Sequence, residues 1–345
     1  MLPDALITLI AVLDLAAFVT AVGGLACLLW MVPWNTIREP ALIELAWHRL
    51  RHLLAIALAI LATTSALLLV VRAVQMSGLG LSALWPVLPT VVLHTHYGTV
   101  WLVRVAAIGM LWIGWLLTGA ARKRRTVGVM GVAAAVLAWT YSATGHAADQ
   151  GDFTVMEWIH WLHMLTVSLW GGCVLAVAVA LAGLLVPRSP GQRAFIAVTM
   201  HRFSYIAILA VIGISASGVF VAIQQLSNVH DLWTTDYGRM LLTKLAMVFA
   251  MLVLGVFNRF ALSPALRTWL GAGRLPRAPE APGHAARPGE RGVGKTMVWH
   301  RRLMITQAVL VVAVLLCAIL LAASMPPSQH TLMKHPPAGA AHTMP

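Results

Sequence analysis

The sequence predicts an all-α membrane protein with eight transmembrane helices arranged as two four-helix parallel repeats. Of the 345 residues, 60% are hydrophobic and only 10% are charged, whereas charged residues make up about a quarter of a soluble domain. The apolar residues also occur in runs of roughly 20, the length with which an α-helix crosses a bilayer. The alternation typical of a membrane β-barrel is absent. A soluble globular fold is therefore excluded.

Eight apolar runs meet this length criterion. They lie at about residues 5–31, 50–71, 96–118, 126–147, 155–186, 203–226, 238–261 and 301–323. The segment Ala73–Leu93 is also apolar, but Pro86 and Pro89 interrupt it, so we expect a surface or re-entrant loop there. No basic segment precedes the first apolar run, so we expect no cleavable signal peptide.

The charges predict the orientation of the helices. Most basic residues lie in alternate loops, within 38–51, 122–125, 188–202 and 259–302. The positive-inside rule places such loops in the cytoplasm. Both termini are then expected outside, which in a bacterium means the periplasm, and the protein is expected to be a multi-pass protein of the bacterial inner membrane. The net charge of +13 therefore reflects topology and does not indicate nucleic-acid binding.

Short motifs recur in the same order in the two halves of the chain. The run HTHYGTVWLVRVA matches TTDYGRMLLTKLA, which aligns Arg104 with Lys244. The second and sixth spans begin with HRL at His48 and HRF at His201. These matches favour a duplication of four helices, and an even number of spans keeps both copies in the same orientation. Apolar helices that contain glycine can also resemble each other by composition alone.

Two further matches pair polar residues between the copies. A shared Leu-x9-Gly spacing aligns Asp14 with His163, and the ends of the fourth and eighth spans align His146 with Met325. The interface between the copies is then the expected place for a site.

The duplication defines the expected domains. The first repeat covers 1–152 and the second covers 153–325, with a disordered cytoplasmic loop at 263–298 that is rich in Pro, Gly and Arg. A periplasmic tail follows at 326–345. That loop contains GERGVGKT, which formally matches a phosphate-binding motif. Because no strand precedes it, we expect neither phosphate binding nor a role for ATP.

Imidazole and thioether side chains gather at the expected outer face. Imidazole suits copper, zinc, iron and nickel, and thioether narrows the choice toward Cu(I). His160 and His163 share one helix face, and His146 ends the preceding span, so His146 and His163 can face each other. The predicted copper ligands are His146, His163, His160, Met325, His94 and His96. For His94 and His96, hydrogen-bonded anchoring at the interface is an equal alternative.

Two charged residues in the outer halves of spans are expected to support this site. Asp14 is a candidate acceptor for His163 or Arg104, or a proton relay, whereas Arg104 is expected to snorkel outward. In the tail, His330, Met333 and His335 have the spacing of a flexible metal-capture arm. An unstructured terminus without this role is the alternative.

The histidines at the inner face allow two interpretations. His48, His52, His201 and His300 lie beside arginines at the starts of spans. They form either basic interfacial collars or the axial ligands of haem b, which need two histidines on facing helices. The three cysteines lie inside spans without a CxxC pair, so we expect them to pack as small buried side chains.

Several of these segments together resemble the copper resistance protein D (CopD) family of bacterial inner-membrane proteins. They are TGHAA, WLHMLTVSLWGG, RFSYIAILAVIGISASGV, DYGRMLLTKLAMVFAMLVLGVFNRF and AASMPP. The resemblance implies a protein that handles periplasmic copper, sometimes beside a soluble periplasmic copper carrier. It also implies a fold related to membrane b-type cytochromes, which keeps haem b open as a cofactor.

From these observations we expect a copper-binding inner-membrane protein that takes copper, preferably Cu(I), at the periplasmic face and transports it across the bilayer. Such a protein contributes to copper homeostasis and resistance and is not an enzyme. The alternatives are a haem b-containing electron carrier or cupric reductase, and a copper sensor that transports nothing.

Overall fold

The computed structural model describes residues 3–33, 39–118, 124–145, 151–185, 189–226, 228–258 and 290–324, and every regular element in these ranges is a helix. The expected all-α fold is confirmed over these residues. Seven of the described helices are long and apolar enough to cross a membrane. They are α1 (Asp4–Ala26), α2 (Pro40–Ser77), α4 (His96–Leu117), α6 (Val155–Ala176), α7 (Pro190–Gln225), α9 (Asp236–Phe257) and α11 (Glu290–Ala323).

The span expected at 126–147 corresponds to α5 (Arg124–Ser142), which is not among these seven. With 19 residues it is the shortest of the long helices, and it begins with two arginines, which lower its mean hydropathy. It nevertheless lies inside the bundle, packed against α4 and α6.

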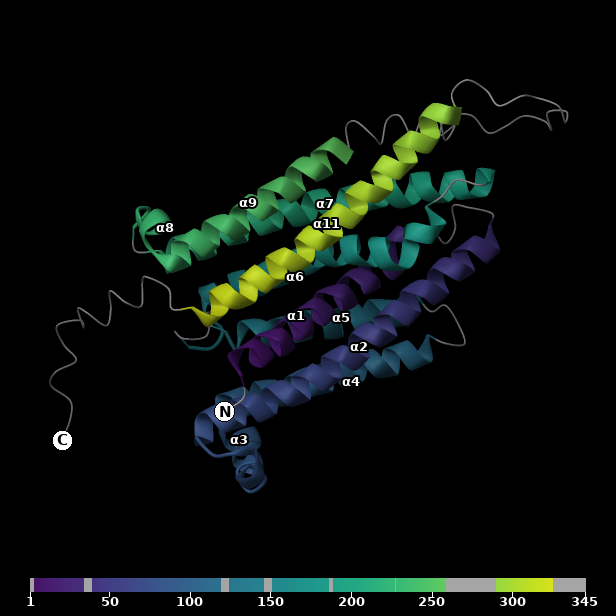
Figure 1. The fold of residues 1–345 in the computed structure, drawn as a ribbon. Coiled ribbons are helices and arrows are strands. Elements are labelled where there is room, and N and C mark those ends of the chain that lie inside the picture. Colours follow the sequence, from purple (N-terminus) through teal and green to yellow (C-terminus); the bar gives the residue numbers. More distant parts are fainter. Residues whose placement is uncertain are drawn as a thin grey trace, which may run out of the picture.

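The long helices run along one common direction and alternate in polarity (Figure 1). The helices α2 and α4 lie on one side of the bundle, α7, α9 and α11 lie on the other, and α1 and α6 lie between them (Figure 1). The start of α1 and the end of α11 are at the same end, where the short helices α3 (Leu88–His94) and α8 (Asp231–Thr234) also lie.

Two helices are longer than the expected spans at 50–71 and 203–226. Helix α2 has 38 residues and α7 has 36, so at about 1.5 Å per residue each exceeds the roughly 30 Å hydrocarbon core. Each begins with a proline in its first turn, Pro40 and Pro190, where the missing N–H removes no helical hydrogen bond.

The segment between α2 and α4 contains no helix long enough to cross a membrane, whereas Ala73–Ser77, expected to belong to a surface or re-entrant loop over Ala73–Leu93, are the last residues of α2. Helix α2 ends at Gly78, which adopts a left-handed conformation with φ of 68°, and a short 3-10 turn (Leu81–Ala83) leads to α3. Leu84 and Val91 cluster with Leu69 of α2, so this hairpin packs against the adjacent ends of α2 and α4.

One expectation about the loop at 263–298 is wrong. Residues 290–298 are helical and form the first turns of α11, whereas 263–289 lie outside the described residues. Glu290, Arg291 and Lys295 are good helix formers, and the apolar helix that follows extends back through them. Nearly all of the GERGVGKT run is therefore helix, not the loop after a strand that cradles phosphate.

The centre of the bundle is a close crossing of α1 and α6. A Cβ on Gly23 would lie 1.9 Å from the carbonyl carbon of Gly172, and a Cβ on Gly172 would lie 2.1 Å from Val19 O. Small residues permit such backbone contact between membrane helices. Just beyond this point both helices become π-helical, in η1 (Cys27–Met31) and η4 (Val177–Leu181). Helix α2 packs against η4, and α7 packs against η1.

The starts of α4 and α9 have the same local structure. Gly98 N donates to Thr95 Oγ1 and Gly238 N donates to Thr235 Oγ1, both at 3.0 Å. At each glycine an added Cβ would collide with a carbonyl of the short helix before it, α3 or α8. A two-helix corner is thus built in the same way in both halves of the chain.

Candidate metal centre

His163 lies in the first half of α6 and faces α7. Its Nδ1 is 3.0 Å from the hydroxyl of Ser217. When that hydroxyl donates to Gly213 O at 2.5 Å, it accepts from His163 Nδ1, which then carries the proton. The tautomer so fixed leaves the lone pair on Nε2, the nitrogen that a metal would bind. His160 lies one turn earlier on α6 and is half-buried.

Five of the ligands predicted at the outer face and in the tail cannot be placed relative to His163. His146, Met325, His330, Met333 and His335 lie outside the described residues, so their predicted proximity to His163 stays a prediction. Within the described ranges, no group of three or more His, Cys, Asp or Glu side chains is placed to hold a metal ion.

His94 and His96 lie at the corner between α3 and α4. His94 is exposed, while His96 Nε2 is 3.0 Å from Ala143 O beyond α5 and 3.6 Å from Asp152 Oδ1. His96 therefore connects the start of α4 to the segments on either side of the α5–α6 connection. These are the contacts of a hydrogen-bonded anchor, one of the two roles expected for it.

Asp14 is the centre of a buried polar cluster that joins four helices. Its Oδ1 accepts from Thr64 Oγ1 at 2.7 Å, and its Oδ2 accepts from Tyr141 OH at 2.6 Å. Arg104 Nη1 lies 3.7 Å from the same Oδ2. Of the two partners expected for Asp14, these contacts select Arg104 and not His163.

Arg104 does not snorkel outward, so that expectation is wrong. The residue is 5% exposed, its Nε donates to Thr140 Oγ1 at 3.0 Å, and its guanidinium lies 4.2 Å from the centroid of the Tyr141 ring. The carboxylate of Asp14 compensates the charge locally, which removes the need to reach water.

His163 and its neighbours repeat this arrangement in the second half. Extending the HRL and HRF register along α2 and α7 aligns Thr64 with Ser217. The Thr64–Asp14 hydrogen bond in one half thus matches the Ser217–His163 hydrogen bond in the other. Lys244, which aligns with Arg104, is electrostatically coupled to His163.

Sequence reasoning missed Thr64 and Ser217, although the signal was present. Both lie 16 residues after the first His of the matched motifs, His48 and His201. A hydroxyl at the same register inside two long apolar helices is a marker of shared polar contacts, because an unsatisfied polar group at membrane depth is costly.

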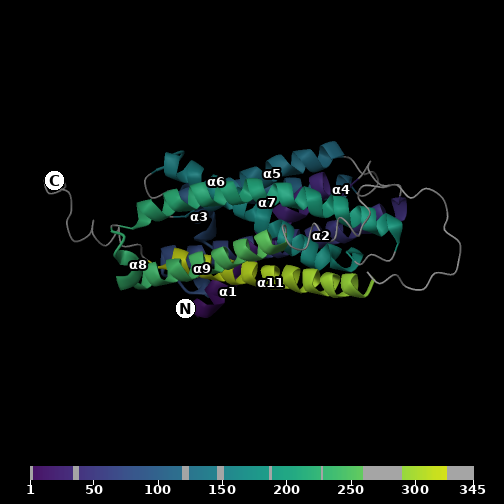
Figure 2. The same cartoon turned by 90° about the horizontal axis from the view of Figure 1, so that it is seen from above.

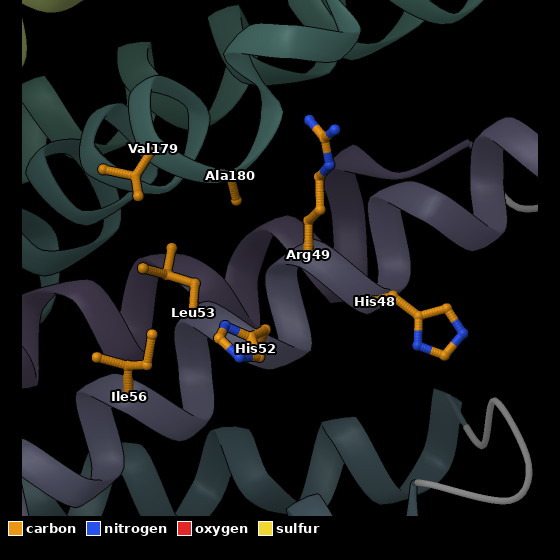
Figure 3. Close-up of a pocket in the computed structure, with 7 residues that line it drawn as sticks. All are labelled: His48, Arg49, His52, Leu53, Ile56, Val179 and Ala180. Atoms are coloured by element: carbon orange, nitrogen blue, oxygen red, sulfur yellow. The ribbon is translucent and has the colours of Figure 1, made fainter.

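The histidines predicted to lie at the inner face are only partly brought together. His48 and His52 line a pocket of about 460 Å³ with Arg49, Leu53, Ile56, Val179 and Ala180, between α2 and η4 (Figure 3). His201 instead packs edge-on against Tyr205 on α7, and the side chain of His300 lies outside the described residues. Both histidines of the pocket come from one helix, whereas axial haem ligation needs two facing helices.

Arginines next to these histidines reach from one half of the chain to the other. Arg202 donates from α7 to Trp30 O and Val32 O at the end of η1, at 3.0 and 3.2 Å. The matching Arg49 extends from α2 toward the segment after η4, with its guanidinium next to Gly183. Such contacts to the last carbonyls of a helix are favourable for a cation.

Comparison with known proteins gives the family. The protein-family model "Copper resistance protein D-like, N-terminal domain" matches residues 1–155, and the family model "Copper resistance protein D" matches residues 197–321. No solved structure matches.

Two curated relatives are similar to this chain. One is copper resistance protein D of Pseudomonas syringae pv. tomato, 32% identical over 200 residues, or 54% of this chain and 61% of that protein. The other is inner membrane protein YebZ of Escherichia coli (strain K12), 27% identical over 178 residues, or 51% of this chain and 58% of that protein. The chain thus spans about three fifths of the length of each. With its seven apolar helices, it is a multi-pass inner-membrane protein and belongs to the copper resistance protein D family.

Proposed function

We propose that this protein binds copper at the periplasmic face and transports it across the inner membrane, and so contributes to copper homeostasis and resistance. The observation that carries the proposal is the geometry of His163. A half-buried imidazole, oriented by Ser217 with Nε2 left for ligation, is the arrangement that protein metal sites use to orient a ligand. The family name supports copper as the metal.

The proposed architecture is two parallel four-helix repeats with both termini in the periplasm. Three observations support it: the Gly23–Gly172 crossing of α1 and α6, the matching corners before α4 and α9, and the matched hydrogen bonds of Thr64 and Ser217. In this architecture α5 is the eighth membrane helix. It runs antiparallel to α4 before it and to α6 after it, which keeps the directions of successive helices alternating (Figure 1).

We place the copper path along the interface between the repeats. It begins at His160 and His163, where a soluble periplasmic carrier is the proposed donor, and it ends at the inner pocket beside His48 and His52. The protein acts as a transporter and not as an enzyme, with flux that follows a gradient or is coupled to protons.

The test is copper uptake into proteoliposomes loaded with a copper indicator. We expect wild-type protein to give uptake above empty vesicles and His163→Ala to abolish most of it. His230→Ala is the matched control, because His230 is exposed in the loop before α8. Uptake by wild-type protein no greater than by empty vesicles would overturn transport, and equal loss in both variants would overturn the role of His163.

The second candidate is a haem b-containing electron carrier or cupric reductase, for which the pocket beside His48 and His52 offers histidines from α2 alone. A visible spectrum of the purified protein separates the two candidates. A Soret band from stoichiometric haem would establish the redox protein, and its absence together with bound copper favours transport.

A further inference from the structure

Three sulfur-bearing side chains gather in the core of the bundle, away from the histidines discussed above. Cys27 Sγ lies 3.3 Å from Met31 Sδ. Across the α1–α6 crossing, Cys173 Sγ lies 3.7 Å from Gly23 O, the same carbonyl that accepts from Cys27 N. All three residues have exposed fractions of 0%, and both cysteines are free thiols.

Backbone features on both helices bring these atoms together. Cys27 and Met31 are the first and last residues of η1, and Val32 N donates to Cys27 O at 3.1 Å, the i to i+5 bond of a π-turn. Such turns inside α-helices occur frequently at functional sites. On the facing helix, Cys173 Sγ donates to Gly23 O at 3.7 Å, a contact that the missing side chain of Gly23 permits.

The donor set is selective for one kind of metal. Thiolate and thioether ligands are soft and favour Cu(I) over harder ions, whereas the imidazole, carboxylate and carbonyl groups that suit other metals are absent from this set. Binding releases thiol protons. Loss of one proton gives a neutral assembly of Cu(I) with one thiolate, one thiol and one thioether, and neutrality suits an apolar interior where a net charge is costly.

We propose that Cys27, Met31 and Cys173 form a Cu(I)-binding site at the crossing of α1 and α6. The site lies between the outer histidines and the inner pocket, because Cys173 follows His163 on α6 and precedes Val179 and Ala180 of η4, which line that pocket. The proposal that this site binds copper does not depend on the proposed function. Its role as an intermediate site on the copper path rests on the proposed function. Complete burial means that copper enters only when the helices move apart locally.

The test is Cu(I) binding by the reduced full-length protein in detergent, under anaerobic conditions, in competition with a chromogenic Cu(I) chelator. X-ray absorption at the copper edge then identifies the ligand atoms. We expect wild-type protein to show a sulfur shell in which Cys27→Ala and Cys173→Ala each lower the number of sulfur neighbours. Loss of a supporting contact typically lowers metal affinity by about 10- to 100-fold, so we expect each ligand substitution to cost at least that much.

Cys317→Ala is the matched control, because Cys317 is also buried but lies on α11 next to Met240 O. It should leave the sulfur shell and the affinity unchanged. Met31→Leu preserves packing volume and should reduce the number of sulfur neighbours without unfolding the protein. The site is overturned if wild-type protein lacks the sulfur shell, or if Cys27→Ala elutes as a folded species and keeps the wild-type number of sulfur neighbours and the wild-type affinity.

Copper uptake into proteoliposomes distinguishes a failure of the proposed binding site from a failure of the proposed transport function. A sulfur shell in wild-type protein that transports no copper would overturn transport and leave the binding site standing. Normal copper uptake by Cys27→Ala, in a protein that has lost sulfur neighbours around the copper, would overturn the role of this site as an intermediate on the copper path.

Discussion

At the scale of single residues, Asp14 shows how a charge is kept inside a membrane helix. It is 1% exposed, and its two oxygens are occupied by Thr64, Tyr141 and Arg104 from three other helices. A buried ion pair is a weak source of net stability, but the loss of one partner leaves the other charge uncompensated. The cluster therefore fixes how four helices fit together.

We expect Asp14→Ala to destabilise the protein by about 3–5 kcal/mol, because Arg104 is left buried without its counter-charge. Asp236→Ala is the control: Asp236 is 98% exposed in its 2.8 Å pair with Arg239, and such surface pairs contribute about 0–1 kcal/mol. Thermal unfolding in detergent, followed by circular dichroism, measures both. Equal unfolding temperatures for the two variants would contradict the structural role of Asp14.

A second prediction at this scale concerns the hydroxyl that orients His163. Ser217→Ala should lower copper affinity by about 10- to 100-fold, as expected when the group that orients a metal ligand is lost. Thr64→Ala removes the matching hydrogen bond to Asp14 in the other half and should leave copper affinity near the wild-type value. Copper titration against a competing chelator measures both variants, and the conservative Ser217→Thr should restore binding. Indistinguishable affinities for Ser217→Ala and Thr64→Ala would exclude this role.

At the scale of elements, the crossing of α1 and α6 depends on two glycines at matched positions. Without a hydrophobic driving force between helices in lipid, close packing of small residues is what holds membrane helices together. Gly23 and Gly172 bring the two backbones into contact, and the π-turns that follow change the direction of the side chains on both helices.

We expect Gly23→Ala to destabilise the protein by about 1–3 kcal/mol, because its Cβ would overlap backbone atoms of Gly172 and Cys173 that cannot rotate away. Gly24→Ala introduces the same group one residue later, where no atom lies within 4 Å. It should be neutral or stabilising by up to about 1 kcal/mol. Unfolding temperatures of the two variants in detergent provide the comparison, and a reversed order would show that the helices do not cross at this point.

At the scale of the whole molecule, α5 decides the topology. If α5 spans the bilayer, α1 begins and α11 ends on the same side of the membrane; if it does not, they lie on opposite sides. The alternating directions of the helices place both points at one end of the bundle (Figure 1). Figure 2, seen from above, shows α5 running alongside α6 for much of its length.

Reporter fusions test this topology directly. We expect alkaline phosphatase fused to the C-terminus to be active in the periplasm, and the same enzyme inserted between residues 263 and 289 to be inactive. The basic residues of that loop retain it in the cytoplasm. Activity in the loop together with inactivity at the C-terminus would invert the orientation proposed here.

The sequence by itself determined the class of protein and the positions of its helices. In lipid every backbone hydrogen bond must be made within the segment, so an apolar run of sufficient length is enough to predict a spanning helix. The pairing of Asp14 with His163, and of Arg104 with Lys244, also came from the sequence, because a repeated motif carries its register with it.

Only the tertiary structure decided which side chains meet. Membrane helices are apolar both toward lipid and toward their neighbours, so the amphipathic pattern that reveals the inner face of a soluble helix is lost. Rotation about each helix axis then follows from packing alone. That rotation turned Arg104 inward to Asp14, and it placed Cys27 and Cys173, which are 146 positions apart in the sequence, beside the same carbonyl of Gly23.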